Sequence, residues 1–220
     1  MQSNEERIRA VEELKPELAS LDVGTMNYGI FPMVEKYKNW KFDWEYPYLA
    51  GTKNGVFVNS FQSLEHFAKT MAEVSAVPEV DIFDSSWVQN AAYLVRRGFI
   101  TQKPLWIQFV VGVLGGSPCS VETLVFLLQT AKQLLPDFYW SLAGADRFPF
   151  AFLAAALAMG GNVRVGMEDN LYTSRGQLSQ SNAEEAEKAA RLIREVGFEV
   201  ASPDEARETI QTKGKDRVNF

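Results

Sequence analysis

Five short apolar segments that alternate with amphipathic helical patterns constrain the fold of this 220-residue chain most strongly. The later segments recur every ~25 to 35 residues, a spacing typical of a βα repeat. Apolar runs of this length, separated by helices, predict the strands of a parallel sheet. The chain shows no internal repeat or flexible linker, so the pattern favours a single domain over residues 1–220. The predicted strands are residues 18–23, 78–84, 105–111, 138–143 and 162–165.

Helix-capping residues mark the starts of several predicted helices. Ser120 and Ser181 each precede a helical pattern, and a serine at this position accepts hydrogen bonds from the first free backbone amides. Ser202 followed by Pro203 fits an N-cap with proline at the first helical position. The predicted helices cover residues 4–14, 61–69, 120–135, 149–159 and 181–196, with a last short helix opening at Ser202.

Residues 160–170 combine three glycines with Arg164, Glu168 and Asp169 at the end of a predicted strand. In α/β sheets and barrels, ligands bind and reactions occur at the carboxyl ends of the strands. The three charged side chains are therefore predicted to cluster in a functional site. The alternative interpretation is a solvated turn in which an arginine pairs with a carboxylate.

The second predicted strand carries acids at alternate positions. Strand alternation places Glu79 and Asp81 on one face and Val80 and Ile82 on the other. Acids within a strand are costly unless they have a partner or a chemical role. Asp81 is therefore a second candidate for chemistry.

Composition and missing motifs exclude several functional classes. A formal net charge of −6 argues against a nucleic-acid surface, which needs a basic face. No apolar run approaches the roughly 20 residues of a membrane span, and residues 1–6 are too polar to open a signal peptide, so we expect no membrane partner and a cytoplasmic location. The sequence has no phosphate-binding P-loop, dinucleotide glycine motif or nucleophile elbow. The single Cys119 and the single His66 are predicted to have packing or surface roles.

Residues 37–61 form an aromatic-rich insert without a regular pattern. Such a density of aromatic side chains outside a regular element is typical of an oligomer contact or a lid. The insert therefore predicts a homo-oligomer or a moving cover.

Several motifs together resemble the β-keto acid cleavage enzymes, a family typified by 3-keto-5-aminohexanoate cleavage enzyme. The resemblance extends over more than nine-tenths of the chain, and its most specific segment is residues 160–170. The other matching segments are residues 20–29, 78–81, 107–110 with Gly115 and Gly116, 140–144, and 201–207.

The resemblance implies a fold and a reaction. Members of the family are (β/α)₈ TIM barrels that bind zinc, and this chain would carry about the last five βα units. They convert a β-keto acid and acetyl-CoA into acetoacetate and a new acyl-CoA by a retro-Claisen exchange. The implied cofactor is therefore Zn²⁺ or another divalent metal, with acetyl-CoA as co-substrate.

The resemblance also implies roles for individual residues. Glu168 would be the carboxylate zinc ligand, with Asp169 and Arg164 as the acid, base and orienting pair beside it. Asp81 stands where the family has a glutamate for proton transfer, and one methylene less would move its carboxylate by ~1 Å. Ser20 replaces a threonine hydroxyl, and the loop with Gly115 and Gly116 would approach CoA. The resemblance thus implies that Asp169, Arg164, Asp81 and Ser20 are catalytic, that Gly115 and Gly116 bind the cofactor, and that Glu168 binds the metal.

The sequence departs from the family in its metal ligands. The family's other two zinc ligands form a His-x-His pair on an early strand, and His66 lies in no such motif. Three interpretations are open: a piece of a longer protein, a chain completed by another chain, or a degenerate relative. A noncatalytic α/β assembly module with a remnant carboxylate site is the alternative function. Asp146 adds a charge near the implied metal and CoA entrance.

Overall fold

Five parallel strands form one sheet in the computed structural model, which describes residues 2–145 and 149–220. The strands pair in the order in which they occur along the chain, and β1 and β7 form the two edges of the sheet. This arrangement confirms the predicted α/β class and parallel sheet, with strand ends shifted by at most two residues. The strands are β1 (Leu18–Asp22), β4 (Val77–Ile82), β5 (Leu105–Val111), β6 (Phe138–Gly144) and β7 (Asn162–Arg164).

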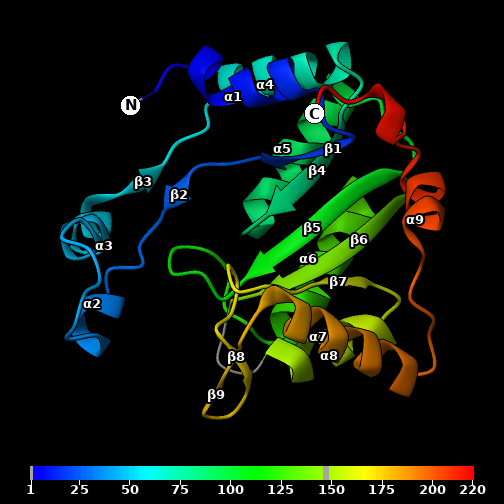
Figure 1. Ribbon diagram of the computed structural model, residues 1–220. Helices are drawn as coiled ribbons and strands as arrows, with labels where there is room; N and C mark the ends of the chain where they lie inside the picture. The colour runs from blue at the N-terminus through cyan, green and yellow to red at the C-terminus, as the bar shows by residue number, and fades with distance from the viewer. Residues whose placement is uncertain (1, 146–148) are drawn as a thin grey trace.

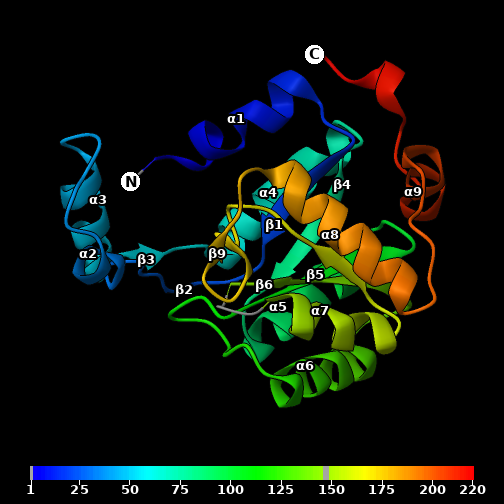
Figure 2. The ribbon, with the colours of Figure 1, turned by 60° about the horizontal axis from the view of Figure 1, so that its bottom comes forward.

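A helix follows each strand, and these helices line one side of the sheet in chain order (Figures 1 and 2). Sequential strand order with neighbouring helices is the winding of a βα barrel, whereas a doubly wound sheet reverses its order at a switch point. Asp84 ends no strand; it caps α5 by accepting a hydrogen bond from the Ser86 amide at 3.0 Å. The helices are α4 (Phe61–Glu73), α5 (Ser85–Arg96), α6 (Val121–Leu134), α7 (Pro149–Ala158) and α8 (Asn182–Glu195).

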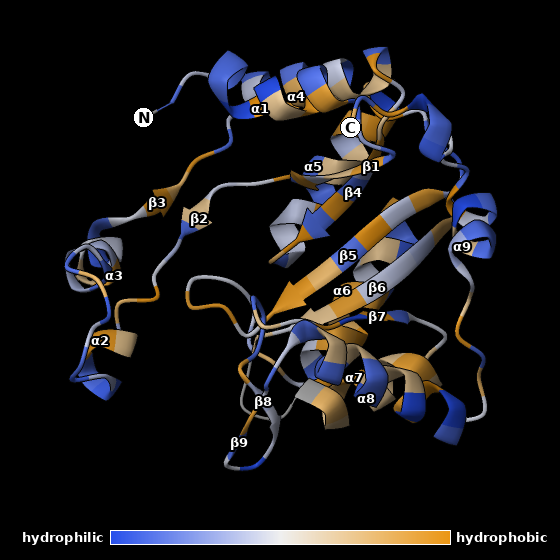
Figure 3. Cartoon of the chain, viewed as in Figure 1, coloured by the Kyte–Doolittle hydropathy of each residue, from blue (hydrophilic) through white to orange (hydrophobic). Residues whose placement is uncertain are grey.

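The core lies between the sheet and this helical layer. Alternate strand residues such as Val80, Ile107 and Leu142 are fully buried there. Trp87 of α5 packs so closely under the turn after β1 that a Cβ on Gly24 would lie 2.3 Å from its ring. Figure 3 shows β5 as mostly hydrophobic and α9 (Pro203–Ile210) as mostly hydrophilic, because the strand is central and the helix lies at the surface.

An arm projects from the end of β1 (Figures 1 and 2) and carries a group of exposed aromatic side chains. The predicted irregularity of residues 37–61 is wrong in part, because the arm contains regular elements. Its aromatic rings pack on one another, as Trp44 stacks on Phe42 and meets Tyr48 edge to face. The elements are β2 (Met26–Asn27), α2 (Met33–Lys36), α3 (Glu45–Gly51), the 3₁₀ turn η1 (Thr52–Asn54) and β3 (Val56–Phe57).

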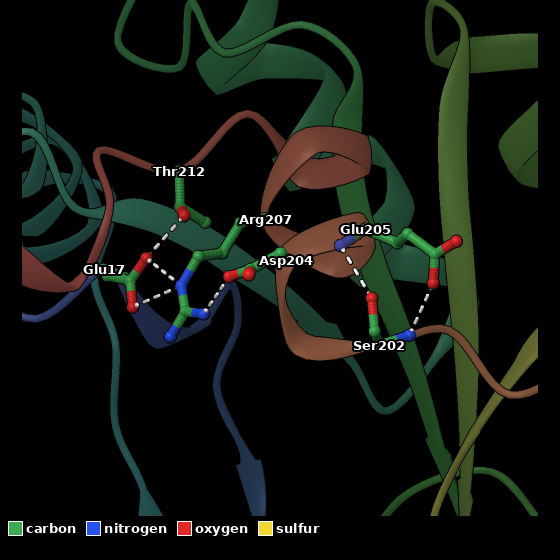
Figure 4. Close-up of polar contacts among 6 residues, drawn as sticks. All are labelled: Glu17, Ser202, Asp204, Glu205, Arg207 and Thr212. Carbon is green, nitrogen blue, oxygen red and sulfur yellow. Dashed lines mark hydrogen bonds and ion pairs between the residues drawn. The ribbon is translucent and has the colours of Figure 1, made fainter.

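The C-terminal segment returns to the amino ends of the strands and ties them to α1 (Asn4–Leu14). Arg207 of α9 donates to Glu17 at 3.0 Å, and Glu17 also accepts from Thr212 (Figure 4). The Asn219 amide donates to the Leu14 carbonyl, so the end of the chain lies against the end of α1. Residues 213–217 include the 3₁₀ turn η2 (Lys215–Arg217) and hold Lys213 against the Val74 carbonyl.

A short hairpin lies at the exit of β7. The hairpin of β8 (Tyr172–Ser174) and β9 (Gln177–Leu178) follows the β7 exit and packs beside α8. Within the described ranges, none of the helices is long and apolar enough to cross a lipid bilayer. Asp146, expected to alter the entrance of the site, lies outside the described residues.

Candidate active site

Arg164 is the last residue of β7 and meets two acids from the turn that follows it. The amides of Asp169 and Asn170 donate to the Gly166 carbonyl, and this tight turn brings the acids back towards the strand end. Arg164 Nε lies 2.9 Å from Asp169 Oδ2, and its terminal nitrogen lies 3.2 Å from Glu168 Oε2. The predicted cluster of these three side chains is therefore present in the structure.

The two acids of this cluster differ in exposure. The Asp169 side chain is 11% exposed, whereas the Glu168 side chain is 85% exposed. Burial raises the pKa of Asp169 in spite of the ion pair with Arg164. Burial also opposes the charge on Arg164, but the ion pairs outweigh it and raise the arginine's pKa. Arg164 is thus a fixed cation between a buried acid and an acid that faces solvent.

Asp81 lies in a row of polar side chains that crosses four neighbouring strands at one level. The residues Asp22, Asp81, Gln108 and Ser141 are successive register partners on β1, β4, β5 and β6. Because paired residues of a parallel sheet point to the same face, these four side chains share the face opposite the helix-packed core. The predicted separation of Asp81 from Val80 and Ile82 is confirmed by this register.

Hydrogen bonds join three members of the row. Ser141 Oγ donates to Gln108 Oε1 at 3.1 Å, and Gln108 Nε2 donates to Asp81 Oδ1 at 2.8 Å. All three side chains are buried, with at most 4% of each residue exposed. In this orientation the Gln108 amide donates on one side and accepts on the other. Asp81 is therefore held by one oxygen, Oδ1.

The two acids of the row have raised pKa values. Burial raises the pKa of Asp22 to about 6, against the attraction of Arg7 and Arg164. Burial, together with the charges of Asp22 and Glu79, raises the pKa of Asp81 to about 8. Perturbed acids that also have a specific neighbour are candidates for catalysis. Near neutral pH, the row thus contains a protonated Asp81 beside a mostly ionised Asp22.

The remaining predicted site residues have other surroundings. Ser20 lies on the same face as Asp22 but two residues closer to the amino edge, where it is exposed. Gly115 has a φ of +107°, and a Cβ there would lie 1.7 Å from the Asn27 carbonyl oxygen of β2. A Cβ on Gly116 would lie 3.1 Å from the Phe83 carbonyl oxygen. Glycine is therefore required at position 115 by close backbone packing against β2, whereas position 116 is only tightly packed against the residue after β4, whatever their relation to CoA.

The described residues do not form a metal site by themselves. No group of three or more histidine, cysteine or acidic side chains that could hold an ion occurs within residues 2–145 and 149–220. Glu168 can offer one carboxylate, which is engaged with Arg164. His66, the single histidine, lies on α4 with its ring against Phe67. The implied zinc ligand Glu168 thus has no partner ligand among the residues that the structure describes.

The sequence motifs missed three members of the polar row: Asp22, Gln108 and Ser141. All three occur within the segments that carry the family resemblance, but none has a local pattern that marks it as chemical. The available signal was positional, since each is a polar residue within or at the end of a predicted apolar strand. Strand register was needed to show that they lie at one level.

The sequential parallel sheet, with charged groups at its carboxyl edge and a polar inner row, defines an α/β fold of the βα-barrel type. The model of the beta-keto acid cleavage enzyme family matches residues 1–211, so the chain belongs to this family. The predicted family is thereby confirmed.

Two proteins similar in sequence to this chain are named as an acetyl-CoA-dependent transferase and a keto-acid cleavage enzyme. The chain is 36% identical over 216 residues to 3,5-dioxohexanoate:acetyl-CoA acetone transferase of Paraburkholderia graminis, covering 98% of this chain and 69% of the relative. It is 38% identical over 208 residues to 3-keto-5-aminohexanoate cleavage enzyme of Acetoanaerobium sticklandii, covering 94% and 66%. The chain thus spans about two thirds of the length of these relatives.

A solved structure supports the fold. The apo structure of ObcA superposes with a TM-score of 0.69 at 17% identity, covering 90% of this chain and 44% of that chain. At this identity the likeness concerns the fold alone.

Proposed function

We propose that this chain contains the proton-transfer residues of a β-keto acid cleavage enzyme that uses acetyl-CoA. In the reaction, a β-keto acid and acetyl-CoA give acetoacetate and a new acyl-CoA. The proposal rests above all on the partly buried Arg164–Asp169 pair at the exit of β7, in a chain that belongs to the family. The names of the two relatives above support acetyl-CoA and a β-keto acid as the reactants.

The geometry of the pair suits the first proton transfer. The carbon between the ketone and the carboxylate of a β-keto acid must lose a proton before it can attack the acetyl thioester. Asp169 accepts this proton, and a raised pKa makes a carboxylate a stronger base. Arg164 faces the same point with a permanent positive charge and stabilises the negative charge that develops on the reactants.

The proposal extends to the whole barrel and to the metal. The five βα units would form part of an eight-stranded barrel, with Ser20, Gly115 and Gly116 near the reactants and Glu168 as one ligand of a zinc ion. Zinc would polarise the ketone when bound. Because the described residues supply only Glu168, no step is derived through the metal.

The exposed aromatic side chains of the arm favour a self-association role in addition to catalysis. Phe42, Trp44, Tyr46 and Tyr48 are each between 49% and 62% exposed. We therefore propose a homo-oligomer, located in the cytoplasm, in which the arm is a contact. Sedimentation of the purified chain and of a Trp44→Ser, Tyr48→Ser variant tests this: a smaller species is expected for the variant, and a monomeric wild-type chain would contradict it.

The catalytic proposal is tested by direct product analysis. The purified 220-residue chain is incubated with isotope-labelled acetyl-CoA and 3-keto-5-aminohexanoate or 3,5-dioxohexanoate, with and without added Zn²⁺. We expect labelled acetoacetate and the matching acyl-CoA by mass spectrometry, and their loss in Asp169→Asn. Absence of acetoacetate under all of these conditions would overturn the proposed function.

A further inference from the structure

Asp81 has an asymmetric environment, and this asymmetry identifies the oxygen that carries its proton. Gln108 Nε2 donates to Oδ1, so Oδ1 accepts and is the carbonyl-like oxygen of a neutral acid. The amide cannot turn over without losing the bond from Ser141 Oγ to Gln108 Oε1. The proton of a neutral Asp81 is therefore left on Oδ2.

The charges around Asp81 favour its neutral form. Asp22 is its register partner on β1, and Glu79 lies two residues earlier on the same face of β4. Both repel a charge on Asp81, whereas Arg164 attracts one from β7. Arg7 of α1 and Arg164 attract the negative charge of Asp22, whereas Glu168 repels it. Two carboxyls in neighbouring register positions disfavour a doubly charged state, and the acid supported by Arg7 ionises first.

We infer that Asp22, Gln108 and Ser141 are positioning residues of Asp81, the proton donor of the reaction: Asp22 keeps Asp81 neutral, and Gln108, bonded to Ser141, leaves the proton on Oδ2. The inference rests on the proposed function and deepens it, because it assigns the second proton transfer to a defined atom. Attack on the acetyl thioester releases CoA thiolate, which then adds to the original ketone carbon. When the carbon–carbon bond breaks, that carbon leaves as the new acyl-CoA, the acetoacetate carbanion takes the Oδ2 proton and Asp81 becomes a carboxylate. Asp81 regains a proton from solvent, and Asp169 returns its own to solvent, so protons balance over one turnover.

The ionisation of Asp81 can be measured without any enzymatic activity. The carboxyl carbons of aspartate-labelled protein are titrated by carbon-13 NMR, and the Asp81 signal is assigned by its absence in Asp81→Asn. We expect a midpoint near 8 in the wild-type chain. An Asp81 carboxyl that titrates below pH 5 would overturn the inference. This titration does not depend on activity, so it can also be carried out on a chain that forms no acetoacetate. Failure of the proposed function is thereby distinguished from failure of this inference.

Variants of the neighbours test each positioning role. Asp22→Asn removes the nearest like charge, so the midpoint of Asp81 is expected to fall by about 1 unit. Glu79→Gln is the matched control on β4 and is expected to give a smaller shift, because Asp22 is the stronger influence on Asp81. An Asp81 midpoint that does not move in Asp22→Asn, or moves more in Glu79→Gln, would contradict the role of Asp22.

The amide is tested in the opposite direction. Gln108→Leu removes a hydrogen bond that favours the charged form, so the midpoint of Asp81 is expected to rise. Ser141→Ala is a gentler variant in case the leucine disturbs folding. It frees the amide to turn its oxygen towards the Asp81 proton, and this also raises the midpoint. Unchanged midpoints in these variants would contradict the roles of Gln108 and Ser141.

Discussion

Two arginines with nearly the same ion-pair distances lie at opposite ends of the parallel strands, here called the carboxyl edge and the amino edge of the sheet. Arg164 at the carboxyl edge binds buried Asp169 and exposed Glu168, and Arg207 at the amino edge binds partly buried Glu17 and exposed Asp204 (Figure 4). The contact distances lie between 2.9 and 3.2 Å in both clusters.

Asp169 and Glu17 differ in burial and in neighbours, and these differences reverse the direction of the pKa shift. Glu17 receives hydrogen bonds from Arg207 and Thr212, which lower its pKa. Asp169 is desolvated and faces further acids, Glu168 and Glu185, and its pKa is raised. The amino-edge cluster therefore stabilises the fold, whereas the carboxyl-edge cluster contains an acid suited to proton transfer. Because each arginine makes two ion pairs, counting ion pairs would not distinguish the roles of the two clusters.

The largest expected difference between the clusters is in activity. Asp169→Asn removes the proposed base and is expected to lower acetoacetate formation by ~10²- to 10⁴-fold. Glu17→Gln, the matched variant at the other edge, is expected to leave kcat unchanged at a temperature where the chain is folded. Equal losses in both variants, measured by labelled acetoacetate, would break the distinction between the edges.

The buried acids of the inner row are expected to make stability depend on pH. The folded-state pKa values of Asp22 and Asp81, about 6 and about 8, lie above the ordinary value of 3.8. The folded state then binds more protons than the unfolded state, so the free energy of unfolding falls as pH rises from about 4 to 8. Each unit of difference is worth about 1.4 kcal/mol, so a loss of several kcal/mol is expected.

Urea unfolding at pH 5, 6, 7 and 8, followed by tryptophan fluorescence, measures this fall. Asp81→Asn removes the acid that titrates last, so its curve is expected to flatten above pH 6. A wild-type curve that rises from pH 5 to 8 would show that other groups dominate the pH dependence.

A smaller effect of the opposite sign is expected at the amino edge. The lowered pKa of Glu17 contributes stability that is present above its ordinary value of 4.5 and is lost as pH falls. Glu17→Gln is therefore expected to lower the urea midpoint modestly at pH 7 and hardly at all at pH 3.5. The same loss at both pH values would indicate packing instead of charge as its cause.

The smallest effects are expected for the exposed acid of each cluster. The side chains of Glu168 and Asp204 are 85% and 88% exposed, and exposed ion pairs contribute little to stability. Glu168→Gln and Asp204→Asn are each expected to change the free energy of unfolding by less than ~1 kcal/mol. A larger loss in Glu168→Gln alone would mean that Glu168 supports the turn after β7.

The local parts of the structure were predictable from the sequence. The Ser202 N-cap and Pro203 predicted the start of α9, and the capping box with Glu205 confirms it (Figure 4). The arm was not predictable in the same way, because aromatic side chains obscured the weak helical signal of α3. Within the site, Arg164, Glu168 and Asp169 were found because they lie within six residues of one another.

The amino-acid sequence by itself determined the βα alternation, the helix caps and the turn that folds Asp169 back onto Arg164. These depend on periodicity and on contacts between residues close in the chain. Only the tertiary structure decided that Asp22, Asp81, Gln108 and Ser141 lie at one level, and that Glu17 meets Arg207 from 190 residues away. Strand register and chain return set these contacts, and a shift of one residue would turn the polar row towards the core.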